Sequence, residues 1–292
     1  MEPWFWAAIG AAILAGVSNF YFKTAAAKGF HAETFSFYGS IVTLILIGSA
    51  YLVFPAPLFT NPVVAIAVFL GGFLAAISVI MKVYALRYID TTIDFPLFKL
   101  LAPAVAIVLG VTVFAEQFST AEWIGLILGL SVPLLLINKI ESQRQNNLVL
   151  GLLFVLVTGI ISAFSAAINK FGIDAGLAIV VTFAYMALGL LAGNLFTIAW
   201  KDGVFNVIDR IRSASSLGLV KAGTLRSVLI TVSVGLTLYG YWLGGPLAIM
   251  QTIHSMYILI PIVLAIIFYN EHWNLQKAAA ILLSVASLVL LG

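Results

Sequence analysis

The sequence predicts an all-helical integral membrane protein with ten transmembrane helices, arranged as two inverted five-helix repeats around a central cavity. Three observations lead to this fold class. Hydrophobic residues make up 63% of the 292 residues and charged residues only 9%, whereas soluble domains average about 25% charged. Ten apolar segments approach the length of about 20 residues that a helix needs to cross a bilayer. Features of the first half also recur 155 residues later.

The predicted helices follow one another in order along the chain. They cover residues 3–22, 34–54, 63–86, 92–114, 120–137, 148–168, 177–200, 223–244, 246–269 and 274–291. The first segment is similar in length to the core of a signal peptide, but Glu2 stands where a signal peptide has basic residues, and the apolar run continues to Phe22. We therefore interpret it as a retained membrane helix.

The longest connection, residues 201–222, contains a short amphipathic pattern. Val204, Ile208 and Ile211 are spaced i, i+4 and i+7, which places them on one helical face, while the nearby charges lie away from it. This pattern favours a short helix at the membrane interface. A regulatory or partner-binding loop is the alternative.

The internal repeat determines the predicted arrangement of the helices. Four pairs of positions coincide at the offset of 155: Tyr84 with Tyr239, Glu116 with Glu271, Gly125 with Ala280 and Gly129 with Ser284. The repeats are residues 1–137 and 148–292, joined by the polar linker 138–147. Because each repeat has an odd number of helices, the second enters the membrane upside down relative to the first, an architecture typical of transporters.

Basic residues predict the orientation of the chain in the membrane. Twelve of the fourteen lie beside connections on one side, counting Lys82 near the end of the third helix and Arg226 near the start of the eighth. Lys170 lies on the other side, and Lys99 is inside a helix. By the positive-inside rule, the basic connections are cytoplasmic and both termini face outward. We expect a multi-pass protein in the inner membrane of a bacterial or archaeal cell.

Several short patterns resemble one family of transporters. They are residues 15–23 (AGVSNFYFK), residues 85–88 (ALRY) and the glutamate–aromatic junctions at Glu116 and Glu271. Together with the five-plus-five duplication, they resemble the drug/metabolite transporter superfamily, specifically its ten-helix EamA-type members, although the usual tryptophan of the first pattern is absent. This resemblance implies a basket of helices around a central cavity that moves metabolites or amino acids, commonly outward, without ATP hydrolysis.

The residues themselves exclude several other functions. The chain has no Gly-x-x-x-x-Gly-Lys-Ser/Thr loop for nucleotide phosphates, and Glu271-His272 lacks the second histidine of a zinc helix motif. We therefore expect no enzyme activity, no cofactor and no metal site. The expected partners are a small-molecule substrate, the lipid bilayer and a coupling ion, either proton or sodium. Nucleic acid is not an expected partner.

Lys99 and His254 are the first candidates for substrate contact. An unpaired cation within a membrane helix costs at least about 2.5–3.5 kcal/mol, so Lys99 should face a cavity. Snorkelling to the interface and an ion pair with Asp94, five residues earlier, are alternatives. His254 occupies the position equivalent to Lys99, and either proton coupling or an ordinary interhelical hydrogen bond would explain it. A cationic Lys99 suggests a substrate with a carboxylate or another anionic group.

Other polar and aromatic residues extend this candidate site. Gln251, His254 and Ser255 lie within one helical turn and give the ninth helix a polar face that lipid would penalise, and Tyr257 lies nearby. Tyr84 and Tyr239 close the third and eighth helices, where they form either an interfacial aromatic belt or a wall that binds substrate.

Lys23, Asp94, Glu116 and Glu271, all near helix ends, are candidates for gating or structural roles. Asn19, also a candidate for substrate contact, and Lys23 end the first helix, where capping or snorkelling competes with a gating role. Glu116 and Glu271 are expected to cap the helix that follows each of them. Since the repeat is inverted, these glutamates lie on opposite membrane faces and cannot form a catalytic pair.

These observations predict a secondary transporter that works by alternating access. A flippase for lipids or lipid-linked sugars and a non-transporting scaffold subunit are the alternatives. Gly189 and Gly193 are a candidate homodimer face, although packing within the chain explains them equally well.

Overall fold

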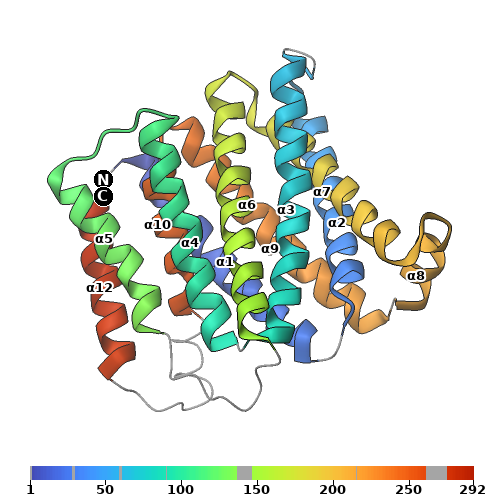
Figure 1. Ribbon diagram of the computed structural model, residues 1–292. Coiled ribbons are helices and arrows are strands. Elements are labelled where there is room, and N and C mark those ends of the chain that lie inside the picture. Colours follow the sequence, from blue (N-terminus) through green and yellow to red (C-terminus); the bar gives the residue numbers. More distant parts are fainter. Residues whose placement is uncertain are drawn as a thin grey trace.

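The computed structural model describes residues 2–27, 30–58, 61–89, 91–136, 147–214, 216–260 and 275–292. All regular structure within these residues is helical (Figure 1). The helices of the first half are α1 (Pro3–Ala27), α2 (Ala32–Val53), α3 (Pro62–Tyr88), α4 (Thr91–Thr112) and α5 (Thr120–Leu135). The second half contains α6 (Leu148–Asp174), α7 (Ile179–Asp202), η2 (Val204–Asn206), α8 (Val207–Ala214), α9 (Leu217–Trp242), α10 (Leu247–Ser255), η3 (Met256–Ile258) and α12 (Leu275–Leu291).

The ends of the helices follow local sequence signals. Ser119 and Glu122 form a reciprocal capping box at the start of α5. Ser216 accepts a hydrogen bond from the Leu219 backbone N–H, so α9 begins before the apolar stretch predicted from residue 223. The helix predicted within the longest connection is confirmed as α8. The part of the predicted ninth helix after residue 260 and the polar linker up to residue 146 lie outside the described residues.

The length and composition of the helices are those of a multi-pass membrane protein. Among the described residues, six helices are long and apolar enough to cross a membrane: α2, α3, α4, α6, α7 and α9. The apolar helices α5 and α12 are shorter. Many large apolar side chains lie on the outer surface, for example Val63 (73% exposed) and Leu282 (70%), as expected for a surface that lipid covers.

The two halves of the chain are interlocked. Extensive packing joins α1 to α9, α3 to α6, α2 to α7, α4 to α10 and α5 to α12. Each of these pairs combines one helix from the first half with one from the second, and several lie side by side in Figure 1. Neither half therefore completes its packing alone.

Small residues permit the closest of these approaches. A Cβ atom at Gly189 would meet the Phe69 backbone, and one at Gly193 would meet the backbone of Phe73 and the side chain of Ala76. Both glycines thus pack against α3 within the chain, as the second explanation of this motif predicts. On the other side of the bundle, the Ser287 hydroxyl donates a 2.7 Å hydrogen bond to the Gly125 carbonyl, joining α12 to α5.

Both ends of the chain lie at the same end of the bundle (Figure 1). Gly292 lies against the ring of Phe5, which is 1% exposed.

Candidate functional site

Two packed helices are irregular at the same level of the bundle. Pro96 and Pro103 lie within α4, and a proline at position 103 cannot donate the helical hydrogen bond to the Lys99 carbonyl. The partner helix, α10, changes at Met256 into the 3₁₀-helix η3, which carries Tyr257. Backbone groups that such irregularities leave unpaired are tolerated at membrane depth only where they are buried in protein or line a cavity.

Lys99 lies inside the bundle. Its side chain is only 6% exposed, and its Nζ is 3.6 Å from the centroid of the Tyr257 ring and 5.1 Å from that of Phe98. The ammonium group thus lies over aromatic faces, an arrangement that stabilises a cation by about 2 kcal/mol when water is excluded. It does not reach the interface, and it makes no ion pair with Asp94, whose carboxylate oxygens have no hydrogen-bond partner.

Two further cations lie inside the protein, although the sequence predicts both beside connections. Lys82 and Arg226 are each 9% exposed. The Lys82 Nζ is 4.3 Å from the Phe95 ring centroid and 4.2 Å from that of Phe98, and the Arg226 guanidinium is 5.8 Å from the ring of Phe35. Counting these residues beside cytoplasmic connections was therefore wrong. Both lie inside the predicted apolar segments 63–86 and 223–244, but within four residues of a segment end, where an interfacial cation is equally expected.

These side chains form one group, which we call the central charge cluster: Lys82 from α3, Asp94 and Lys99 from α4, Arg226 from α9 and Tyr257 from η3. Lys82 interacts electrostatically with Asp94, Lys99 and Arg226, and Tyr257 interacts with Asp94 and Arg226. Asp94 is 1% exposed. The cluster thus combines three basic side chains with one carboxyl group in a place where water is largely excluded.

Asn19 and His254 lie at the edge of the central charge cluster. The Asn19 side chain is close enough to the Tyr257 hydroxyl to interact with it, and its Nδ2 donates a 2.6 Å hydrogen bond to the Ala15 carbonyl. The half-buried His254 ring lies edge-on to Tyr257 with a centroid distance of 5.4 Å, and it interacts electrostatically with Lys99. The structure thus brings together four residues predicted for substrate contact: Lys99, Tyr257, His254 and Asn19.

Tyr84 belongs to a different polar group. Its hydroxyl donates a 2.9 Å hydrogen bond to Glu33, which also forms a 3.0 Å ion pair with Lys201. These residues line a groove of about 540 Å³ between α2, α3 and α7, together with the aromatic side chains of Phe196 and Trp200. Tyr84 therefore joins three helices and is not part of the central charge cluster.

The other two predicted contacts also lie elsewhere. Tyr239 is 43% exposed and stacks on Trp242 at a centroid distance of 5.9 Å, as the aromatic-belt alternative predicts. Gln251 donates a 2.9 Å hydrogen bond to the hydroxyl of the buried Tyr241.

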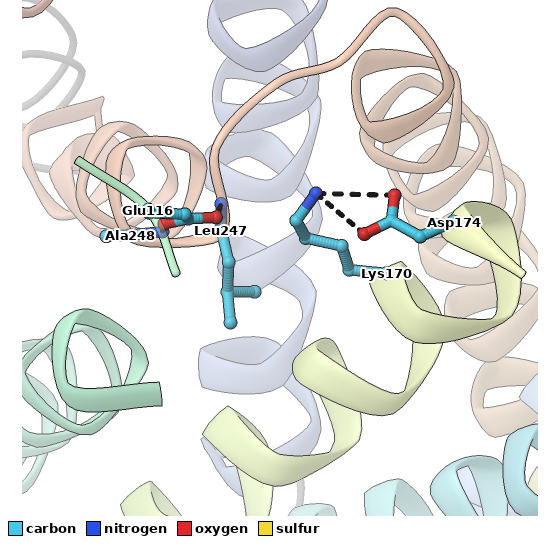
Figure 2. A network of polar contacts seen from close by, with 5 residues as sticks. All are labelled: Glu116, Lys170, Asp174, Leu247 and Ala248. Carbon is cyan, nitrogen blue, oxygen red and sulfur yellow. Dashed lines mark hydrogen bonds and ion pairs between the residues drawn. The ribbon is translucent and has the colours of Figure 1, made fainter. Parts of the chain in front are cut away.

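Glu116 caps a helix, but not the one that follows it. Its carboxylate accepts hydrogen bonds from the backbone N–H groups of Leu247 and Ala248, the latter at 3.2 Å, at the start of α10 (Figure 2). The helix after Glu116, α5, uses Ser119 instead. Burial raises the pKa of Glu116, while its two backbone hydrogen bonds and the positive charge of Lys170 oppose that rise. Figure 2 also shows Lys170 directed toward Asp174. The distance from the Lys170 Nζ to the Asp174 Oδ2 is 3.1 Å.

The side chain of Lys23 and the whole of Glu271 lie outside the described part of the chain.

Comparison with known proteins identifies similar sequences and folds. A solved structure described as "Crystal structure of protein" covers 98% of this chain and 95% of its own length, with a TM-score of 0.74 and 14% sequence identity. At this identity, the likeness shows a shared fold alone. No curated protein matches the sequence. Residues 2–138 match the EamA-like transporter family, so the first half of this multi-pass membrane protein has the sequence features of that family.

Proposed function

We propose that this protein is a secondary transporter of the EamA type that moves a small metabolite with an anionic group by alternating access. The central charge cluster is the observation that carries this proposal. Buried cations are costly in a membrane protein and mark substrate or ion pathways. Here three basic side chains and one carboxyl group meet between helices of both halves. An anionic substrate would supply the missing negative charge.

The helix pairs support the inverted repeat that this mechanism requires. If α1 to α5 correspond to α6, α7, α9, α10 and α12, exchange of the halves converts the α1–α9 pair into α6–α3, and both pairs are extensively packed. The same exchange maps α2–α7, α4–α10 and α5–α12 onto themselves. Lys99 and His254, equivalent at the offset of 155, both lie against Tyr257. We infer that Tyr257 lies near the pseudo-two-fold axis between residues 1–137 and 148–292.

The surroundings of the cations indicate the kind of substrate. Aromatic rings hold Lys82 and Lys99 but carry no net charge, so the ammonium groups can still attract a carboxylate. The same rings offer apolar faces to the rest of the molecule. An amino acid or organic acid has this combination of an anionic group and a compact body.

The groove between α2, α3 and α7 favours a second candidate function. It combines the carboxylate of Glu33 and the amine of Lys201 with Trp200, whose side chain is 82% exposed on the outer surface. A polar group reached from the lipid side suits a lipid-linked substrate, and a flippase would use this groove as its entrance.

Thermal unfolding of the detergent-purified protein tests the proposed function. The panel contains amino acids, organic acids, quaternary amines, phosphorylated sugars and lipid-linked sugars. A ligand at 100 times its Kd stabilises the folded state by about 2.7 kcal/mol. We expect an amino or organic acid to raise the unfolding temperature, and Lys99→Ala to weaken its binding about 10- to 100-fold, because a hydrogen bond to a charged group contributes about 1.5–3 kcal/mol.

The exposed Lys221, on α9, provides the matched control. Lys221→Ala should bind the same ligand as the native protein does. Stabilisation by lipid-linked sugars alone would favour the flippase, and anion binding that survives Lys99→Ala unchanged would contradict the site proposed here.

A further inference from the structure

Asp94 is a carboxyl group without the partners that a buried carboxylate needs. It is 1% exposed, and neither carboxylate oxygen has a hydrogen-bond partner. Burying an ionised carboxylate in this way is unfavourable unless a nearby cation compensates, whereas a protonated carboxyl group is much easier to bury. The transport site described above does not by itself explain why an acidic residue lies here.

Lys82 is the cation that interacts electrostatically with Asp94. The Lys82 ammonium lies over the rings of Phe95 and Phe98, which are one and four residues after Asp94 on the same helix. These rings hold the ammonium group against the same helix as Asp94 without neutralising it. Lys82 can therefore interact with the Asp94 carboxylate or with another anion.

Other titratable groups lie in or beside the central charge cluster. Tyr257 on η3 interacts with Asp94, Arg226 on α9 interacts with Lys82 and Tyr257, and Lys99 on α4 interacts with Lys82 and with His254 on α10. The described charged residues of α5 and α6 belong to the other end of α4, where Lys170 lies over the Phe114 ring and Glu122 caps α5. Asp94 is therefore the one acidic side chain among the described residues of this cluster.

We propose that Asp94 binds the proton that is transported together with the anionic substrate. This inference rests on the proposed transport function. A proton from the aqueous phase converts the Asp94 carboxylate into a neutral carboxyl group, which releases Lys82 to bind the substrate anion. Loss of that proton restores the competing carboxylate and displaces the anion. One proton and one anion thus move in the same direction, and transport of a monoanion is electroneutral.

Infrared difference spectroscopy of the purified protein tests proton binding without requiring transport. Titration with pH should reveal the C=O band of a protonated carboxyl group that is absent in Asp94→Asn and present in Asp174→Asn, the matched control at the other end of the bundle. Asp94→Glu keeps an ionisable carboxyl group and serves as a second variant in case Asp94→Asn folds poorly. In Asp94→Glu the band should shift in frequency. A titration with no band assignable to Asp94 would overturn the proposal and leave the transporter function intact.

Benzoate, a carboxylate with an aromatic body, tests the coupling. At a fixed pH in the range of the titration, adding benzoate should increase the Asp94 band, because benzoate and the Asp94 carboxylate compete for the same cation. A band that titrates with pH but does not respond to benzoate would contradict the coupling.

Discussion

Aromatic rings occupy the places around the buried lysines where counter-ions would otherwise be expected. Lys82 lies over Phe95 and Phe98, and Lys99 lies over Tyr257. A close ion pair would satisfy each ammonium group and leave little attraction for a ligand. A cation–π contact contributes about 0.5–2 kcal/mol and leaves the net charge unchanged. This choice of partner suits a site that must bind and release an anion.

Glu116 is the residue at which we expect a pH-dependent contribution to stability. Its carboxylate accepts hydrogen bonds from the first N–H groups of α10, so Glu116→Ala should lower the free energy of unfolding by about 1 kcal/mol, a typical cost of losing a cap. Thermal unfolding in detergent measures this change. Gln117→Ala, at the exposed neighbouring position, is the control and should have little effect.

The sign of the pH effect follows from the raised pKa of Glu116. A group whose pKa is higher in the folded state stabilises that state most at pH values below its unfolded pKa, about 4.3 for glutamate. This contribution disappears as the pH rises through the folded pKa. Native protein should therefore lose it as the pH rises above about 4.3 and through the folded pKa, whereas Glu116→Gln should not. An identical pH profile in both proteins would contradict this account.

Single residues differ in how well the sequence predicts them. Lys99 and His254 could be identified because charged or titratable groups in the middle of an apolar segment stand out. Lys82 and Arg226 lie only a few residues from the segment ends, where hydropathy cannot distinguish an interfacial cation from a buried one. The cap that Glu116 provides to α10 joins residues 131 positions apart, and no local pattern encodes such a contact.

At the scale of the helices, close packing between α3 and α7 depends on glycine. Gly189→Leu should destabilise the protein by more than the about 1–3 kcal/mol typical of overpacking, because the added side chain meets the Phe69 backbone, which cannot rotate away. Gly48→Leu on α2 is a matched control, since a Cβ atom there has nothing within 4 Å. Thermal unfolding in detergent compares the two variants. Equal stability of the two would show that the α3–α7 contact tolerates a wider separation.

The first and last residues of each helix are easier to predict from the sequence than the helices against which it packs. Long apolar runs determine the spans, and most predicted ends lie within a few residues of the observed ones. The pairing of α1 with α9 and of α3 with α6 depends on contacts between distant parts of the chain. A hydropathy profile contains no term for such contacts, so only the internal repeat suggested that the two halves are related.

At the scale of the whole molecule, the orientation in the membrane can be tested directly because the sequence contains no cysteine. Once Lys82 and Arg226 are removed from the count, ten basic residues still favour one side and Lys170 the other. We therefore expect Gln117→Cys to react with a membrane-impermeant maleimide in intact cells, and Ser213→Cys to react only after lysis. The reverse pattern would invert the orientation, and labelling of both in intact cells would contradict their placement on opposite sides.

The contact between Gly292 and Phe5 has a consequence for the connectivity of the protein. Because the start of the first helix and the end of the last helix are in contact, the two ends of the chain could be joined covalently. A circular permutation that joins these ends and begins the chain anew between Leu136 and Asn147 would reverse the order in which the two halves are synthesised. It would separate none of the packed helix pairs. We therefore expect the permuted chain to form the same helix pairs.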